Sequence, residues 1–142
     1  MAFTDDELAY LQSQRLNRLA TVDLDEQPAV VLVGFEYDGT YFSIRGMDPV
    51  RTRKFRDVAA GRTKVALVID DLASIDPWAP RYLKVDGTAE LVERHGQFGN
   101  PHSIRITPTT SWSFNLDGQG FSHDRPVVVH RTNHLAPTDS ED

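Results

Sequence analysis

The sequence of 142 residues contains no cysteine. This absence excludes disulfide bonds, thiol nucleophiles and cysteine-ligated metal sites, and it is compatible with a reducing cytoplasm, where we expect the protein to act. The sequence also has no run of 18 apolar residues, so we expect no transmembrane helix. Its first ten residues lack the basic-then-apolar order of a secretion signal.

Positive charge is also scarce, because the chain has 15 Lys and Arg but 21 Asp and Glu, which gives a net charge of −6. We therefore expect neither nucleic acid nor an acidic membrane as a partner, and any anion site must be local. The chain has no G-x-G-x-x-G, Walker or G-x-S-x-G motif. If the protein is an enzyme, its reactivity is expected to come from a bound cofactor.

Metal-ligand patterns are missing as well. The acids Asp70, Asp71 and Asp76 have no neighbouring histidine and lack the dense oxygen spacing of a calcium loop. No zinc-binding helix pattern surrounds any histidine. We therefore expect no metal site. The five histidines are His95, His102, His123, His130 and His134.

The chain does contain sequence patterns that are typical of helices and strands. Thr4 and Glu7 form a capping box that predicts a helix to about Arg15, and Asp48 with Pro49 predicts a second helix that Gly61 ends. Apolar runs joined by short turns indicate antiparallel strands, with Gly87 at a bulge. The predicted strands are 18–23, 29–37, 40–45, 64–70, 81–93, 102–108, 111–115 and 126–131.

These elements predict a mainly β fold with two flanking helices, in which a closed or partly closed barrel removes exposed strand edges. We expect one domain over 1–135 and a disordered acidic tail over 136–142. Several strands are apolar on both faces, which suggests a sheet covered on one side by the core and on the other by a second subunit.

The segment 46–62 places five cations in a short stretch of an acidic chain. Arg51 and Lys54 share one face of the predicted helix, and Thr52 adds a hydroxyl. Cations, a hydroxyl and free N–H groups at a helix start are suited to a phosphate. A solvated basic face explains the same spacing, so the residues alone leave both interpretations open.

Trp78 lies in a predicted loop between Pro77 and Pro80. A tryptophan in a rigid loop serves as a lid over a flat ligand, as an anchor in an interface, or as packing on the outside of the barrel. The sequence alone leaves these three roles open.

In combination, "RLATVD", "AVVLVGFEYDGTYFSIR", "RTRKFRDV", "VIDDLASIDPWAPR" and "VDGTAELVE" resemble the pyridoxamine-phosphate-oxidase-like split barrels. The similarity is strongest to the actinobacterial group that depends on the deazaflavin coenzyme F420, and it covers about residues 6–113. The resemblance implies a six-stranded antiparallel Greek-key barrel, and a homodimer with the cofactor groove between its subunits.

The resemblance also implies site residues. In the family a Ser/Thr-x-Lys pattern at the helix start holds the cofactor phosphate, and Thr52-Arg53-Lys54 matches it. The segments 31–33 and 43–45 match strands along the ring, and Trp78 with Arg81 matches a loop that reaches the cofactor from the partner. The implied cofactor-binding residues are Val31, Val33, Ser43, Ile44, Arg45, Arg51, Thr52, Arg53, Lys54, Trp78 and Arg81.

The resemblance implies an F420-dependent reductase that transfers a hydride to an electron-poor C=C or C=O of a small organic molecule. FMN is the alternative cofactor. F420 is favoured because the positive charge of Arg45, Arg53 and Arg56 is more than one phosphate group needs. A split barrel that only binds a cofactor is the alternative from another class. No catalytic residue is assigned, and Arg56 and Arg62 are expected to be solvated. The segment "PVVVHR" beyond Trp112 is expected to form a further strand or an arm across the dimer, where it could cover the substrate side of the groove.

Overall fold

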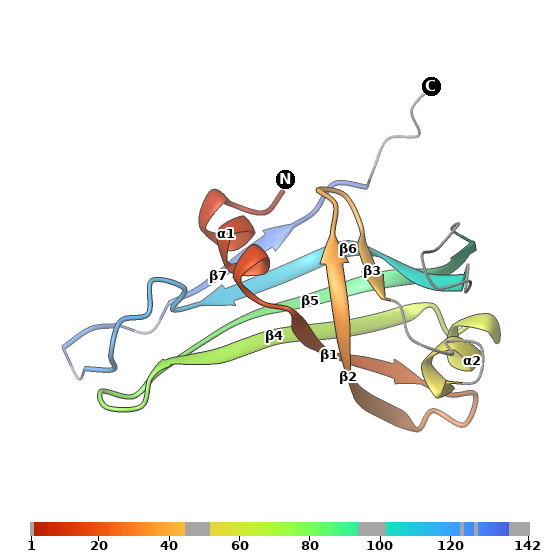
Figure 1. The fold of residues 1–142 in the computed structure, drawn as a ribbon, viewed down its shortest axis with the longest axis horizontal. Coiled ribbons are helices and arrows are strands. Elements are labelled where there is room, and N and C mark those ends of the chain that lie inside the picture. The colour runs from red at the N-terminus through yellow and green to blue at the C-terminus, as the bar shows by residue number, and fades with distance from the viewer. Residues whose placement is uncertain (1, 45–51, 94–101, 123, 127, 137–142) are drawn as a thin grey trace.

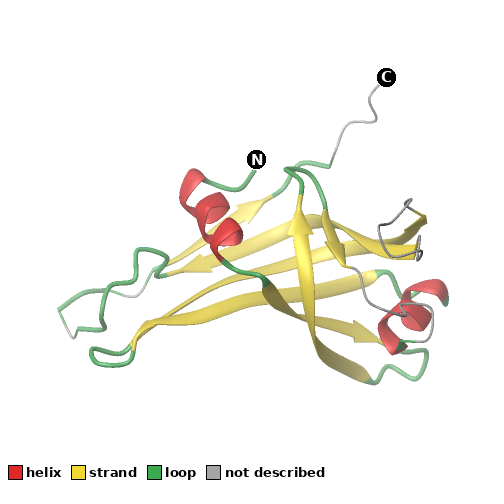
Figure 2. Ribbon diagram, viewed as in Figure 1, coloured by secondary structure: helices red, strands yellow, loops and turns green. Residues whose placement is uncertain are grey.

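The computed structural model describes residues 2–44, 52–93, 102–122, 124–126 and 128–136. Two short helices flank a set of long, twisted strands, which Figure 1 labels and Figure 2 colours by type. In chain order the elements are α1 (Asp5–Ser13), β1 (Leu16–Val22), β2 (Pro28–Tyr37), β3 (Phe42–Ile44), α2 (Arg53–Ala59), β4 (Lys64–Ser74), β5 (Ala79–Glu93), β6 (His102–Phe114) and β7 (Val129–Asn133).

Six of the strands close into an antiparallel barrel. Their order is β3-β2-β1-β4-β5-β6, and β3 pairs with β6 to complete the ring. The partial order β4-β1-β2-β3 is a Greek key. The long strand β6 has two partners along one edge, because its first half pairs with β3 and its second half pairs with β7. The expected six-stranded antiparallel barrel is confirmed, with β7 as an extra strand.

The core lies inside the barrel, where alternate residues of each strand point inward. Leu19 of β1, Ile69 of β4 and Leu83 of β5 have no exposed surface, and Phe42 of β3 packs among other aromatic rings. Burying such a side chain contributes about 1.5–3 kcal/mol each. The outward-facing residues of β1, β4 and β5 are half-buried or exposed, so the outer face of this part of the sheet is available for contacts.

Helix α1 has the predicted capping box. The Thr4 hydroxyl accepts from the Glu7 N–H (3.2 Å), and the Glu7 carboxylate accepts from the Thr4 N–H (2.9 Å). Tyr10 and Leu11 bury the inner side of this helix in the core. Within the described part of the chain, neither helix has the length and apolar character needed to cross a membrane.

Several predicted strand limits are wrong. The loop expected over 71–80 is largely strand, because β4 runs to Ser74 and β5 begins at Ala79. The two strands expected over 102–115 are one strand, β6, in which Pro108 lies opposite Gly87 at a register shift. Proline is tolerated there because a bulge does not require its missing N–H. Strand β7 begins three residues later than expected.

The predicted bulge at Gly87 is confirmed. A Cβ atom at this position would lie 2.7 Å from Ile106 Cγ2 and 2.8 Å from the Thr107 carbonyl oxygen. The chains of β5 and β6 therefore approach too closely for any side chain, which gives this glycine a packing role.

Candidate functional site

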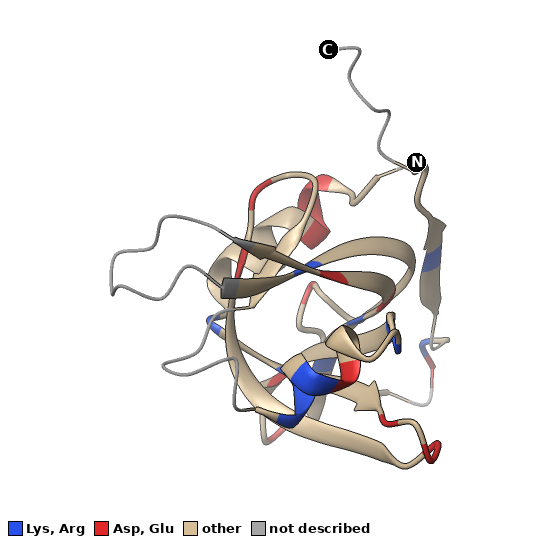
Figure 3. Ribbon diagram, turned by 90° about the vertical axis from the view of Figure 1, so that its right-hand side faces the viewer, with Lys and Arg blue, Asp and Glu red and all other residues tan. Residues whose placement is uncertain are grey.

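The basic segment lies at one end of the barrel, where α2 begins. The N-cap is Thr52, whose hydroxyl accepts from the Phe55 N–H (3.4 Å), so the helix starts later than the predicted cap at Asp48. Thr52 fits because its extended backbone and its hydroxyl suit a cap. Figure 3 views this end of the molecule, with basic and acidic residues of α2 close together. Asp48, Arg45 and Arg51 lie outside the described residues.

Helix α2 is fixed to the barrel by a buried polar contact as well as by the buried side chains of Phe55 and Val58. Asp57 is only 5% exposed, and its carboxylate accepts from the Thr21 hydroxyl of β1 at 2.8 Å. This hydrogen bond holds the orientation of α2 and therefore the positions of the residues at its start.

Arg53 and Lys54 are neighbours with different surroundings. The Arg53 guanidinium donates to the Asp23 carboxylate (3.0 Å) and to the Gln27 carbonyl (3.1 Å), and it lies 3.8 Å from Asp57. The backbone N–H of Gln27 lowers the pKa of Asp23, so this partner is ionised at neutral pH. The structure thus uses the charge of Arg53 to tie α2 to the β1–β2 turn.

Lys54 is half-buried, and burial lowers the pKa of its ammonium group. Within the described part of the chain no carboxylate lies within salt-bridge distance of it. A cation that has lost part of its hydration and has no counter-ion is suited to an anionic ligand. Of the described cations at this end, Lys54 fits a phosphate best, whereas Arg56 is exposed and Arg62 donates to the Leu24 carbonyl.

The strand segments expected along a cofactor ring have different surroundings. Val31 is 41% exposed, but Val33 and Ile44 are 7% and 1% exposed and belong to the core. Any ligand contact of these two residues would have to be made by their backbone. Ser43 lines a pocket of about 950 Å³ between the end of α1 and the β2–β3 hairpin.

Trp78 and Arg81 lie at the other end of the molecule from α2, where β4 turns into β5 (Figure 1). Trp78 is 52% exposed. Within one chain the structure therefore does not bring these two residues together with Lys54.

Arg81 is part of a cluster of side chains that we call the Arg81 clamp: Tyr10, Asp71 and Arg81. Arg81 donates two hydrogen bonds to Asp71 (2.8 and 2.7 Å), and the Tyr10 hydroxyl donates to the same carboxylate at 2.9 Å. These bonds lower the pKa of Asp71, while burial and the adjacent carboxylate raise the pKa of Tyr10. The clamp joins α1 to β4 and β5, and no local sequence pattern predicts it, because Tyr10 lies 61 residues from Asp71 in the chain.

The outer face of the sheet carries a row of residues that no sequence motif had grouped together. The Lys84 ammonium lies 4.6 Å from the centre of the Trp112 ring, which is a cation–π distance. The alternation of inward and outward side chains along each strand is the sequence signal that would have placed the residues of this row on one face of the sheet. Read across the sheet, the row is Leu32, Arg18, Val68, Lys84, Trp112 and Arg131.

Around Leu32, at one end of this row, β1 and β2 expose an apolar surface. Leu16, Val30 and Leu32 are 53%, 67% and 57% exposed. Contiguous exposed apolar side chains of this size are typical of surfaces that another molecule covers.

Two histidines in the described part of the chain, His130 and His134, contact other side chains. His134 Nε2 lies 2.8 Å from the Ser111 hydroxyl, and its ring packs against Phe3. His130 Nε2 lies 3.3 Å from the Thr132 hydroxyl. No three acidic or histidine side chains of the described residues are grouped as metal ligands would be. His95, His123 and the side chain of His102 lie outside the described part.

Residues 3–112 match the pyridoxamine 5'-phosphate oxidase family. A relative from Streptomyces rimosus, a 5a,11a-dehydrotetracycline/5a,11a-dehydrooxytetracycline reductase, is 39% identical over 125 residues, which cover 83% of this chain and 87% of the relative. Among solved structures, an F420 reductase has a TM-score of 0.59 at 22% identity and covers 72% of this chain and 93% of its own. An FAD-binding protein from Mesorhizobium loti has a TM-score of 0.60 at 20% identity, covering 80% and 94%.

Proposed function

Because the chain belongs to the pyridoxamine 5'-phosphate oxidase family, we propose that it is an oxidoreductase that binds a phosphorylated flavin-type cofactor beside Lys54. The observation that carries this proposal is the half-buried ammonium of Lys54, which has no carboxylate partner among the described residues. The dehydrotetracycline reductase relative supports a reductase.

We propose coenzyme F420 as the cofactor, with the F420 reductase among the structural neighbours as support. FMN is the alternative, supported by the FAD-binding neighbour. When bound in its reduced form, the deazaflavin supplies a hydride, and together with one proton from solvent this reduces one C=C or C=O of an organic acceptor. The chain's own residues bind and orient: Lys54 neutralises phosphate charge, and Thr52 fixes the start of α2 beside it.

We further propose that the active form is a homodimer. Trp78 and Lys54 lie at opposite ends of one chain (Figure 1), so a cofactor that touches both must lie between two copies. The exposed Leu16, Val30 and Leu32 offer an apolar surface for such an interface. A monomer by light scattering at micromolar concentration would contradict this part of the proposal.

The test is a fluorescence titration of the purified protein with F420 and with FMN. Lys54→Ala removes one charge-assisted hydrogen bond to phosphate, which predicts a dissociation constant raised about 10- to 150-fold. Lys64→Ala is the matched control, because Lys64 is an exposed lysine with no assigned cofactor contact, and this variant should bind as the wild type does. If neither cofactor binds the wild type, the proposal is wrong.

Activity is tested separately by following the oxidation of reduced F420 in the presence of enones and quinones. Turnover supports a reductase. Tight cofactor binding without turnover of any acceptor would instead support the alternative of a protein that only binds the cofactor.

A further inference from the structure

We propose that a pocket at the C-terminal end of β6 is the substrate site, and that it accepts a flat, largely apolar organic molecule that carries no negative charge. This inference rests on the proposed function and names the substrate class for it. We call this cavity the β6 pocket. It has a volume of about 710 Å³, which suits a drug-sized ligand. Apart from Thr4 and Asp6 it is lined by residues between 113 and 130, beyond the part of the chain that matches the family.

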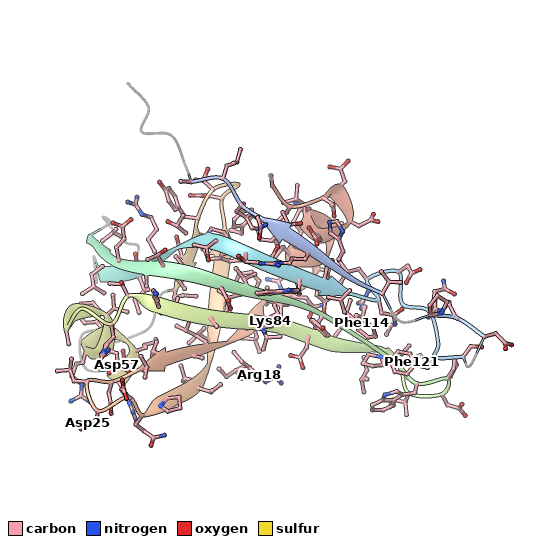
Figure 4. All side chains as sticks on the ribbon, turned by 180° about the vertical axis from the view of Figure 1, so that it is seen from behind. Arg18, Asp25, Asp57, Lys84, Phe114 and Phe121 are labelled. Carbon is pink, nitrogen blue, oxygen red and sulfur yellow. The ribbon has the colours of Figure 1, made fainter. Side chains whose placement is uncertain are left out.

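The lining explains the proposed ligand class. Phe114 and Phe121 meet edge to face, with ring centres 5.8 Å apart, and Tyr82 stacks on Phe114 at 5.3 Å. Figure 4 shows Phe114 and Phe121 together at one end of the sheet. Leu116 and Val128 add apolar surface. Aromatic walls of this kind favour a flat molecule that presents a π face.

The charges at the β6 pocket disfavour an anionic ligand. Asp6 and Asp117 repel an anion. Arg125 is the described cation of the lining with a fixed charge, and its Nη2 already donates to the Gln119 and Gly120 carbonyls (3.2 and 3.1 Å) and to the Asn115 amide oxygen (3.3 Å). Because one positive and two negative charges leave a net negative rim, an anionic ligand is disfavoured.

The walls of this pocket are attached to the loop that carries Trp78. The Phe121 N–H donates to the Trp78 carbonyl (3.0 Å), and the Asn115 amide donates to the Pro80 carbonyl (3.0 Å). Gly120 lies so close to Pro77 that a Cβ atom there would be 2.6 Å from Pro77 Cγ. The segment 115–121 and the Trp78 loop therefore form one unit, and a ligand in the β6 pocket lies beside that loop.

The β6 pocket and the start of α2 lie at opposite ends of the chain. In Figure 4, Asp57 of α2 and Phe121 are at the two ends of the sheet. One copy therefore cannot place a ligand of this pocket against a cofactor held by its own Lys54. The inference requires that each β6 pocket completes the cofactor groove of the other copy.

Binding to the β6 pocket is tested without the cofactor by equilibrium dialysis of 2-(hydroxymethyl)anthraquinone, with anthraquinone-2-sulfonate as its anionic counterpart. Phe121→Ser and Val128→Asp alter exposed positions and should fold, and each should raise the dissociation constant of the neutral quinone about five-fold or more. Leu135→Ala is the control, since Leu135 is exposed outside the lining. Unchanged binding in both pocket variants, or tighter binding of the sulfonate, overturns the inference.

The crossed arrangement is tested by mixing Lys54→Ala with Phe121→Ser subunits, near the wild-type dissociation constant for F420. If the site combines both copies, half of the randomly mixed dimers carry one intact site, so activity recovers to about one quarter of the wild type. If both residues served the same site within one chain, mixing would restore nothing, and this inference would be overturned. Absence of F420 and FMN binding to the wild type would instead mark failure of the proposed function, while quinone dialysis still decides the pocket.

Discussion

The Arg81 clamp provides a direct test of what Arg81 does. The resemblance implies a cofactor contact for this residue, whereas the structure gives its guanidinium two hydrogen bonds to Asp71 and the ring of Tyr10 at 5.0 Å. We predict that Asp71→Ala and Arg81→Ala each lower the free energy of unfolding, and that their effects are coupled.

The magnitude follows from the geometry. A hydrogen bond to a charged group contributes about 1.5–3 kcal/mol. The side chains of Arg81 and Asp71 remain 24% and 27% exposed, so solvent screens the pair and we expect a coupling energy of about 1–3 kcal/mol. Removing the pair should lower the Tm by about 3–10 °C.

The assay is a double-mutant cycle of urea denaturation at one fixed protein concentration, because dimerisation would make stability concentration-dependent. The matched control is the pair of Glu90 and Arg105, whose side chains are 53% and 36% exposed and whose coupling should stay below about 1 kcal/mol. A clamp coupling no larger than that of the control would refute the reasoning. F420 affinity unchanged in Arg81→Ala would further separate the clamp from cofactor binding.

Three other predictions concern stability. Gly87→Ala should cost about 1–3 kcal/mol, because its Cβ atom would meet Ile106 at 2.7 Å, and thermal denaturation against the wild type measures this cost. Thr21→Val should cost about 1–3 kcal/mol, because it leaves the buried Asp57 without its hydroxyl donor, and urea denaturation measures it. Burial lowers the pKa of His134, so its contribution to stability is present above the ordinary histidine pKa of 6.5 and is lost as the pH falls below that value. The wild type should therefore lose more stability than His134→Asn between pH 7.5 and 5, and parallel pH profiles would contradict this.

Much of the fold could be predicted because its signals are local. The capping box at Thr4, the glycine at Gly61 and the apolar alternation of the strands each depend on residues close in sequence. The predicted strand limits were wrong where strand pairing overrode local signals. Pro108 is an example, because β5 accommodates it at a bulge. The predicted start of α2 was wrong, because Asp48 and Thr52 are both residues that favour an N-cap and the local sequence does not distinguish between them.

The candidate site was predicted less completely, because charge counted along a chain ignores partners that fold beside it. Arg53 was counted as available charge, but Asp23 approaches it from thirty residues away in sequence. Lys54 is the described cation of that segment whose surroundings agree best with the predicted role. The sequence suggested only that "PVVVHR" covers the substrate side of the groove. It did not locate the β6 pocket, because the pocket's walls come from both ends of the chain and meet only in the folded barrel.

The short strand β3 also bears on how the barrel moves. In the described part of the chain this strand has three residues, yet through its pairs with β6, such as Phe42 with Ile106, it closes the ring. Among the described residues β3 pairs with β6 over three positions and β5 pairs with β6 over twelve, so the described part of the β3–β6 seam should open first in local fluctuations. Amide hydrogens at this seam would then exchange with solvent faster than those between β5 and β6. The barrel would therefore open locally at β3 while the long strands that carry the β6 pocket stay paired.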